Sequence, residues 1–64
     1  MPRKVRELIA DLKRTGFVER GDKGSHRNFL HPKGMRVTIS GNQADDAKPY
    51  QEKIVRQTIE ESNR

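Results

Sequence analysis

The sequence contains no cysteine, and this absence removes several kinds of chemistry at once. Without cysteine there is no disulfide framework, no thiolate zinc site and no cysteine nucleophile. The sequence also has no apolar run that approaches the roughly 18 residues of a membrane span. Charged residues recur too often near the N-terminus for a signal peptide. We therefore expect a cytoplasmic protein that does not engage a membrane.

Potential metal ligands are also scarce. The two histidines, His26 and His31, are expected on one strand with opposite parity, so they point to opposite faces of a sheet. The adjacent carboxylates Asp45-Asp46 and Glu60-Glu61 are better explained as a turn and a solvated helix end. We expect neither a metal site nor a cofactor. Ser25 precedes His26, but neighbouring strand residues point apart, which disfavours a serine nucleophile activated by this histidine.

What the sequence does have is positive charge on a short chain. With 64 residues and a formal net charge of +5, it predicts a single domain over residues 1–64 and a polyanionic partner, either nucleic acid or an acidic protein. A chain of this length buries only about 60% of its unfolded surface. Any active site must therefore lie on an open surface.

Hydrophobic periodicity predicts a helix at each end of the chain. Val5, Leu8, Ile9 and Leu12 follow helical spacing and predict a helix over about residues 2–15, which Gly16 ends. Pro49 opens a second predicted helix over about residues 49–61. Its expected apolar stripe is less regular and consists of Tyr50, Ile54, Val55 and Ile59, with Thr58 inside it.

Three strands are predicted between the helices, over about residues 17–20, 26–31 and 35–40. Residues 21–25 are expected to form a turn or loop. Pro32-Lys33-Gly34 fits a three-residue hairpin loop, which pairs Phe29 with Val37 and Arg27 with Ile39. Phe29, Met35, Val37 and Ile39 then share the core face, together with Arg27. The opposite face carries His26, Asn28, Leu30, Arg36, Thr38 and Ser40.

These elements predict an α+β fold in the order α-β-β-β-α. The simplest way to bury two helical stripes and one sheet face is a three-stranded antiparallel sheet with both helices on the same side. His26 then faces solvent.

Metal-free RNA cleavage is a reaction that such an open surface can support. The ribose 2′-OH supplies the nucleophile, and a single histidine can transfer a proton because its ordinary pKa of about 6.5 lies near neutral pH. Nearby cations and backbone amides can hold the phosphate. His26 is the candidate for this role, and an exposed strand histidine with no role is the alternative. His31, beside the hairpin turn, is interpreted as structural.

Several of these residues occur in a recognisable set. Gly16-Phe17, Lys23-Gly24-Ser25-His26, His31-Pro32 and Arg36-Val37-Thr38 together resemble the HicA family of mRNA interferase toxins, over about residues 3–40. The resemblance is weaker through the second helix, and the segment from Gly41 to Tyr50 departs from the common family pattern.

This resemblance implies a fold like that of a double-stranded RNA-binding domain and a toxin of a type II toxin–antitoxin system. It also implies a translation-independent endoribonuclease that cleaves mRNA, with His26 as catalytic residue. The implied partner is a HicB-like antitoxin that covers the site, and no DNA binding by the toxin alone is expected. The residues we expect to contact RNA are Lys23, Gly24, Ser25, Arg27, Asn28, Arg36, Lys4, Lys13 and Arg14.

Two other functions satisfy the same charge and size. One is a non-catalytic RNA-binding domain, which would bind RNA with a steep salt dependence but never shorten it. The other is a protein-interaction domain whose basic surface serves only an acidic partner.

Overall fold

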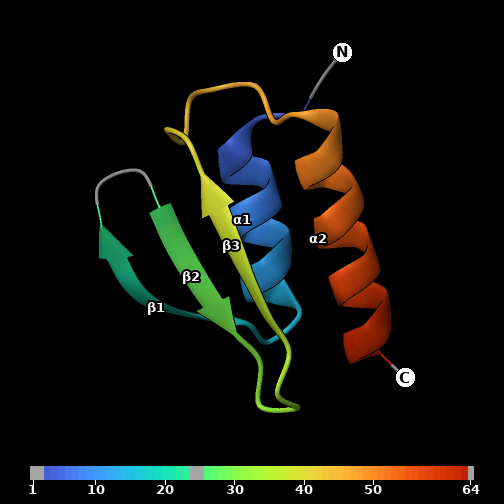
Figure 1. Ribbon diagram of the computed structural model, residues 1–64. Coiled ribbons are helices and arrows are strands. Elements are labelled where there is room, and N and C mark those ends of the chain that lie inside the picture. The colour runs from blue at the N-terminus through green and yellow to red at the C-terminus, as the bar shows by residue number, and fades with distance from the viewer. Residues whose placement is uncertain (1–2, 24–25, 64) are drawn as a thin grey trace.

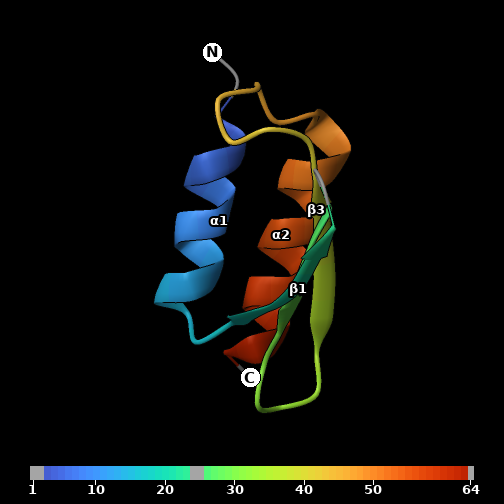
Figure 2. The same ribbon diagram turned by 90° about the vertical axis from the view of Figure 1, so that its left-hand side faces the viewer.

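The structure, a computed structural model, describes residues 3–23 and 26–63. Its elements are α1 (Val5–Arg14), β1 (Val18–Lys23), β2 (His26–Leu30), β3 (Arg36–Ser40) and α2 (Pro49–Ser62). The three strands form one antiparallel sheet in the order β1-β2-β3. Both helices cover the same face of that sheet (Figures 1 and 2). The predicted α-β-β-β-α order is confirmed, and one sheet face is left open.

The predicted hairpin between β2 and β3 has the expected register. Phe29 pairs with Val37 and Arg27 with Ile39. The loop is closed by the His31 amide, which donates to the Met35 carbonyl at 2.9 Å. Gly34 has a φ of 98°, a value that glycine adopts readily because it has no Cβ. Since side chains alternate along a strand, this register decides which residues face solvent.

α1 buries the four apolar residues that its periodicity indicated. It ends in a Schellman motif, in which the Phe17 amide donates to the Leu12 carbonyl at 3.0 Å and the Gly16 amide to the Lys13 carbonyl at 3.2 Å. Phe17, which follows this motif, is buried in the same core cluster as Phe29.

α1 begins at Val5, later than predicted, because the preceding residues are extended. Lys4 forms an isolated antiparallel bridge with Asp46. The Arg3 carbonyl accepts from the Ala47 amide at 2.6 Å, and the Val5 amide donates to the Asp45 carbonyl at 2.9 Å. The connection between β3 and α2 is therefore attached to the start of α1.

The stripe predicted for α2 is confirmed at Val55, which is buried, and at Ile59, which packs partly buried against the core, but it is wrong at its other two residues. Tyr50 and Ile54 are exposed, whereas Gln51 and Val55 are buried. Gln51 is buried because its amide is satisfied: Oε1 accepts from the Lys48 amide at 2.9 Å, and Nε2 donates to the Ser40 carbonyl at 2.9 Å. The polar Gln51 is therefore buried where the hydrophobic pattern predicted that its apolar neighbour Tyr50 would be.

Candidate functional site

The open face of the sheet is the surface opposite the helices, and it contains the residues predicted for it. His26, Asn28, Leu30, Arg36 and Thr38 are exposed there, and Ser40 is partly buried. Since the helices cover only the other face (Figure 2), a ligand can approach these side chains directly.

His26 is the first residue of β2 and is exposed. It pairs with Lys23 of β1 and with Ser40 of β3. It therefore sits in the central strand, with backbone on both sides. The preceding residues Gly24 and Ser25, which we expected to contact phosphate, lie outside the described residues.

Two residues along β2 from His26, a chain of hydrogen bonds through Asn28 crosses the sheet. The Thr38 hydroxyl donates to Asn28 Oδ1 at 2.7 Å, and Asn28 Nδ2 donates to the Gly21 carbonyl at 3.4 Å. Asn28 thus links all three strands, and its amide has a defined orientation because a donor and an acceptor face it on either side.

Residues 21–23 of the predicted loop are instead a bulged part of β1, and the rest of that loop lies outside the described residues. Glu19 pairs with Phe29 and Asp22 with Arg27, so β1 has one extra residue between these pairs. Gly21 lies there with a φ of 66°. Glycine at such a φ permits a bulge without strain, and bulges redirect neighbouring side chains.

Arg20, just before that glycine, is an open-face residue that was absent from the predicted RNA contacts. It lines a shallow hollow on the open face with Asn28, Leu30, Arg36 and Thr38. The signal was present in the strand predicted over residues 17–20, because alternation from an inward-facing Phe17 puts Val18 and Arg20 on the opposite face.

Arg27 does not share the open face with His26. Its guanidinium donates to Glu19 Oε2 at 3.0 Å, and its side chain is only 24% exposed. This placement agrees with the predicted parity, which put Arg27 on the core face. Arg27 was expected to contact phosphate beside His26, but its guanidinium lies on the other face from His26.

The helical cations expected to contact RNA also bind carboxylates of the protein. Lys4 pairs with Asp46 at 2.6 Å, and Lys13 lies 3.7 Å from Glu19 Oε1. Arg14 pairs with Asp11. These cations do not form one surface with His26 and the exposed Arg36.

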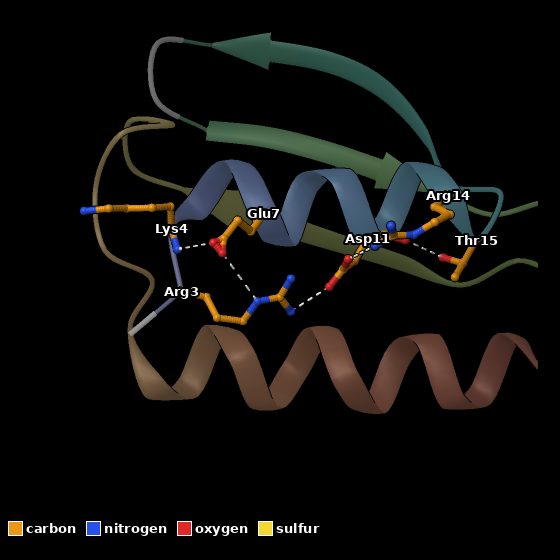
Figure 3. A network of polar contacts seen from close by, with 6 residues as sticks. All are labelled: Arg3, Lys4, Glu7, Asp11, Arg14 and Thr15. Carbon is orange, nitrogen blue, oxygen red and sulfur yellow. Dashed lines mark hydrogen bonds and ion pairs between the residues drawn. The ribbon is translucent and has the colours of Figure 1, made fainter. Parts of the chain in front are cut away.

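Asp11 is the centre of the network that surrounds α1 (Figure 3). It accepts from Arg3 at 2.6 Å and also from Arg14. The hydrogen bond from Arg3 and the nearby positive charges lower the pKa of the Asp11 carboxyl, and the same bond raises the pKa of Arg3. Arg3 lies between the two helices in this view, so the network ties the start of the chain to the middle of α1.

His31 has the structural role predicted for it. Its ring lies 4.8 Å from that of Phe17 between centroids. Nδ1 accepts from the Lys33 amide at 3.1 Å, and Nε2 lies 3.2 Å from the Thr15 carbonyl. The acceptor role of Nδ1 assigns the proton of the neutral ring to Nε2, which donates to Thr15.

Within residues 3–23 and 26–63, no group of three histidine or carboxylate side chains is placed to hold a metal ion. In the same residues, no helix is both long and apolar enough to cross a membrane.

The fold and the open face together define a class: a small basic α+β protein with an exposed histidine on an uncovered sheet. A family model for the HicA toxin of bacterial toxin–antitoxin systems matches residues 5–60, and the chain belongs to that family. The match includes the second helix, where the motifs were weaker. A comparison with curated proteins finds no match. Membership assigns the chain a toxin role and implies an antitoxin partner.

Proposed function

We propose that this toxin is a metal-independent endoribonuclease that cleaves mRNA in the cytoplasm, with His26 as its only catalytic side chain. The observation that carries the proposal is the setting of His26. It is exposed at the start of the central strand, on the same open face as Arg36 and Asn28. That surface lets an RNA strand reach the imidazole without any rearrangement of the core.

The chemistry needs one bond to form and one to break. The ribose 2′-oxygen bonds to the adjacent phosphorus while the bond to the 5′-oxygen breaks. The 2′-OH loses its proton, and the departing 5′-oxygen gains one. His26 carries out one of these transfers and water the other. The products are a 2′,3′-cyclic phosphate and a 5′-OH.

Binding the phosphate is the task of groups near His26. The backbone amides of Gly24 and Ser25, and the cations Lys23 and Arg36, fit this role by their positions along the chain, while Asn28 supplies polar contacts. Four other expected cations are paired with carboxylates of the protein and must leave them to bind phosphate: Lys4, Lys13, Arg14 and Arg27. They therefore contribute less, through more distant parts of the RNA.

A HicB-type antitoxin inhibits the enzyme by covering the open face. The family implies an antitoxin, and this face is where one partner can block His26 and the exposed arginines together. Direct competition between antitoxin and RNA is the expected behaviour.

The test is a cleavage assay on a single-stranded RNA in excess EDTA, with analysis of the product ends. The expected result is cleavage that persists in EDTA and leaves 2′,3′-cyclic phosphate. A matched RNA with 2′-deoxyribose at the cleaved position, and DNA of the same sequence, should stay intact. Loss of activity in EDTA, or cleavage of the 2′-deoxy RNA, contradicts the mechanism. RNA that is bound but never shortened points instead to the non-catalytic RNA-binding domain.

A further inference from the structure

We propose that the hollow between Arg20 and Arg36 on the open face binds one unpaired nucleotide of the RNA beside the cleaved bond. The inference rests on the proposed ribonuclease function and assigns a subsite for its substrate. The hollow is lined by Arg20 of β1, Asn28 and Leu30 of β2, and Arg36 and Thr38 of β3.

The first argument is the charge that this face leaves available. Among the described residues, the ion pairs involve Arg3, Lys4, Lys13, Arg14 and Arg27, and none involves Arg20 or Arg36. Both arginines are exposed.

No carboxylate is found among the open-face side chains that the structure describes: Val18, Arg20, His26, Asn28, Leu30, Arg36, Thr38 and Ser40. Two cations on opposite edge strands, without a neighbouring acid on their own face, suit successive phosphates of one RNA strand.

Second, an apolar floor lies beside these cations: Leu30 lines the hollow, and Val18 lies next to it on β1. Leu30 is 40% exposed and Val18 is 51% exposed. Val18 pairs with Leu30, which pairs with Arg36, so the three form one row across the sheet. An apolar surface next to guanidinium groups suits the face of a nucleobase, because arginine planes stack on bases. In a duplex that face is buried in the stack, so the floor favours an unpaired nucleotide.

The third argument is position relative to His26. Side chains on one face of a strand are two residues apart, which is about 7 Å. Along β2, Asn28 therefore lies about 7 Å from His26, and Leu30 lies about 7 Å beyond Asn28. An RNA strand that runs along β2 from a cleaved phosphate at His26 toward Leu30 passes over the hollow.

The hollow is also well defined in shape. Arg20 follows Glu19, which pairs with the core-facing Phe29, so strand alternation places Arg20 on this face, and Asn28 bonds to both neighbouring strands. A preformed subsite of this kind fixes the register of the RNA and so positions the bond to be cleaved.

The experiment measures RNA binding by fluorescence anisotropy in the His26→Ala background, in which bound RNA is expected to stay intact. The probe is a short labelled single-stranded RNA, compared with its duplex, over a range of salt concentrations. Arg20→Gln and Leu30→Ser test the hollow. The matched controls on α2 are Arg56→Gln, which removes the same charge, and Ile54→Ser, since Ile54 is 43% exposed. Thermal melting confirms that each variant is folded.

For the single strand, Arg20→Gln should weaken binding about tenfold and reduce the slope of log K against log salt by about 0.7. Leu30→Ser should weaken it about three- to tenfold without changing that slope, because it removes a base contact. With either variant, the affinity for the duplex should fall less than about twofold. With either control, the affinity for the single strand should also fall less than about twofold.

The subsite is overturned if Arg20→Gln and Leu30→Ser bind the single strand as tightly as the background, or if Arg56→Gln weakens it as much as Arg20→Gln does. It is also overturned if these variants keep RNA binding but lose antitoxin binding, since the hollow then belongs to the protein partner. If the expected binding pattern appears but the unmutated protein never cleaves RNA, the subsite stands and the proposed enzyme activity fails.

Discussion

At the scale of single residues, the two histidines differ in exposure and in the contacts that they make. His26 is exposed on the open face, whereas His31 contacts Phe17, Thr15 and Lys33 at the end of α1. Strand parity predicted opposite faces for them, but His31 lies just after β2, and its contacts with α1 and the hairpin loop set its position instead. His31 therefore offers a control for the catalytic role proposed for His26.

His31→Ala should destabilise the protein without abolishing cleavage. The variant loses the hydrogen bonds to Thr15 and Lys33 and the ring contact with Phe17, and the free energy of unfolding should fall by about 1 to 3 kcal/mol. Urea unfolding measures this loss. The cleavage rate per folded molecule should remain within about threefold of the original, since the reacting proton does not pass through His31. A His31→Ala protein that is fully folded but inactive contradicts this assignment.

Gly16 is the residue whose replacement most directly disturbs the His31 contact. It has a φ of 101°, and an added Cβ would lie 3.3 Å from His31 Nε2. Gly16→Ala should lower the free energy of unfolding by about 1 to 2 kcal/mol from backbone strain alone, and by more because the imidazole must move.

Gly34→Ala is the matched control, with a φ of 98° and no atom within 4 Å of the added Cβ. The two variants therefore share the backbone strain and differ in the contact. Equal losses of stability in urea unfolding would show that the His31 contact contributes nothing.

At the scale of elements, α1, β2 and β3 could be predicted because their apolar residues repeat with a clear period. The hairpin register followed from one three-residue turn. β1 and α2 were predicted less well, each for a physical reason. The Gly21 bulge extends β1 through residues typical of a loop, and Gln51 is buried by hydrogen bonds that no hydrophobic pattern reveals.

The network around α1 makes stability depend on pH in the acid range. The folded-state pKa of Asp11 is lowered, first by the hydrogen bond from Arg3. A lowered pKa means that the contribution to stability is fully present above the unfolded value of about 3.9 and is lost as pH falls through the folded value. Asp11→Asn should therefore be less stable than the original protein near neutral pH.

The difference between the two proteins should be on the order of 1 kcal/mol at neutral pH, because the pair lies at the surface, and it should shrink below about pH 4. Urea unfolding at several pH values measures it. Arg3→Gln should reduce the same pH dependence, since it takes away the main cause of the shift and leaves only the contribution of Arg14. A difference that stays constant or grows in acid contradicts the network.

At the scale of the whole molecule, composition indicated a polyanionic partner but not where it binds. The net charge is +5, and the cations considered for RNA contact lie on two surfaces. On the helical side, Lys4 pairs with Asp46 and Lys13 with Glu19, acids that lie near them only after folding, whereas Arg14 pairs with Asp11 one turn earlier in α1. On the sheet side, Arg20 and Arg36 stand beside an apolar floor. Side-chain pairing of this kind depends on the tertiary fold, which explains why the expected RNA contacts included residues from both surfaces.

The central claim is that His26 transfers the proton during RNA cleavage, and the most direct test compares the cleavage rates of the original protein and His26→Ala on the same RNA in EDTA. Because His26 is exposed, the variant should melt at nearly the same temperature. Its cleavage rate should fall by about 100-fold or more, the usual contribution of a general acid or base. A folded His26→Ala protein that cleaves RNA as fast as the original contradicts the account.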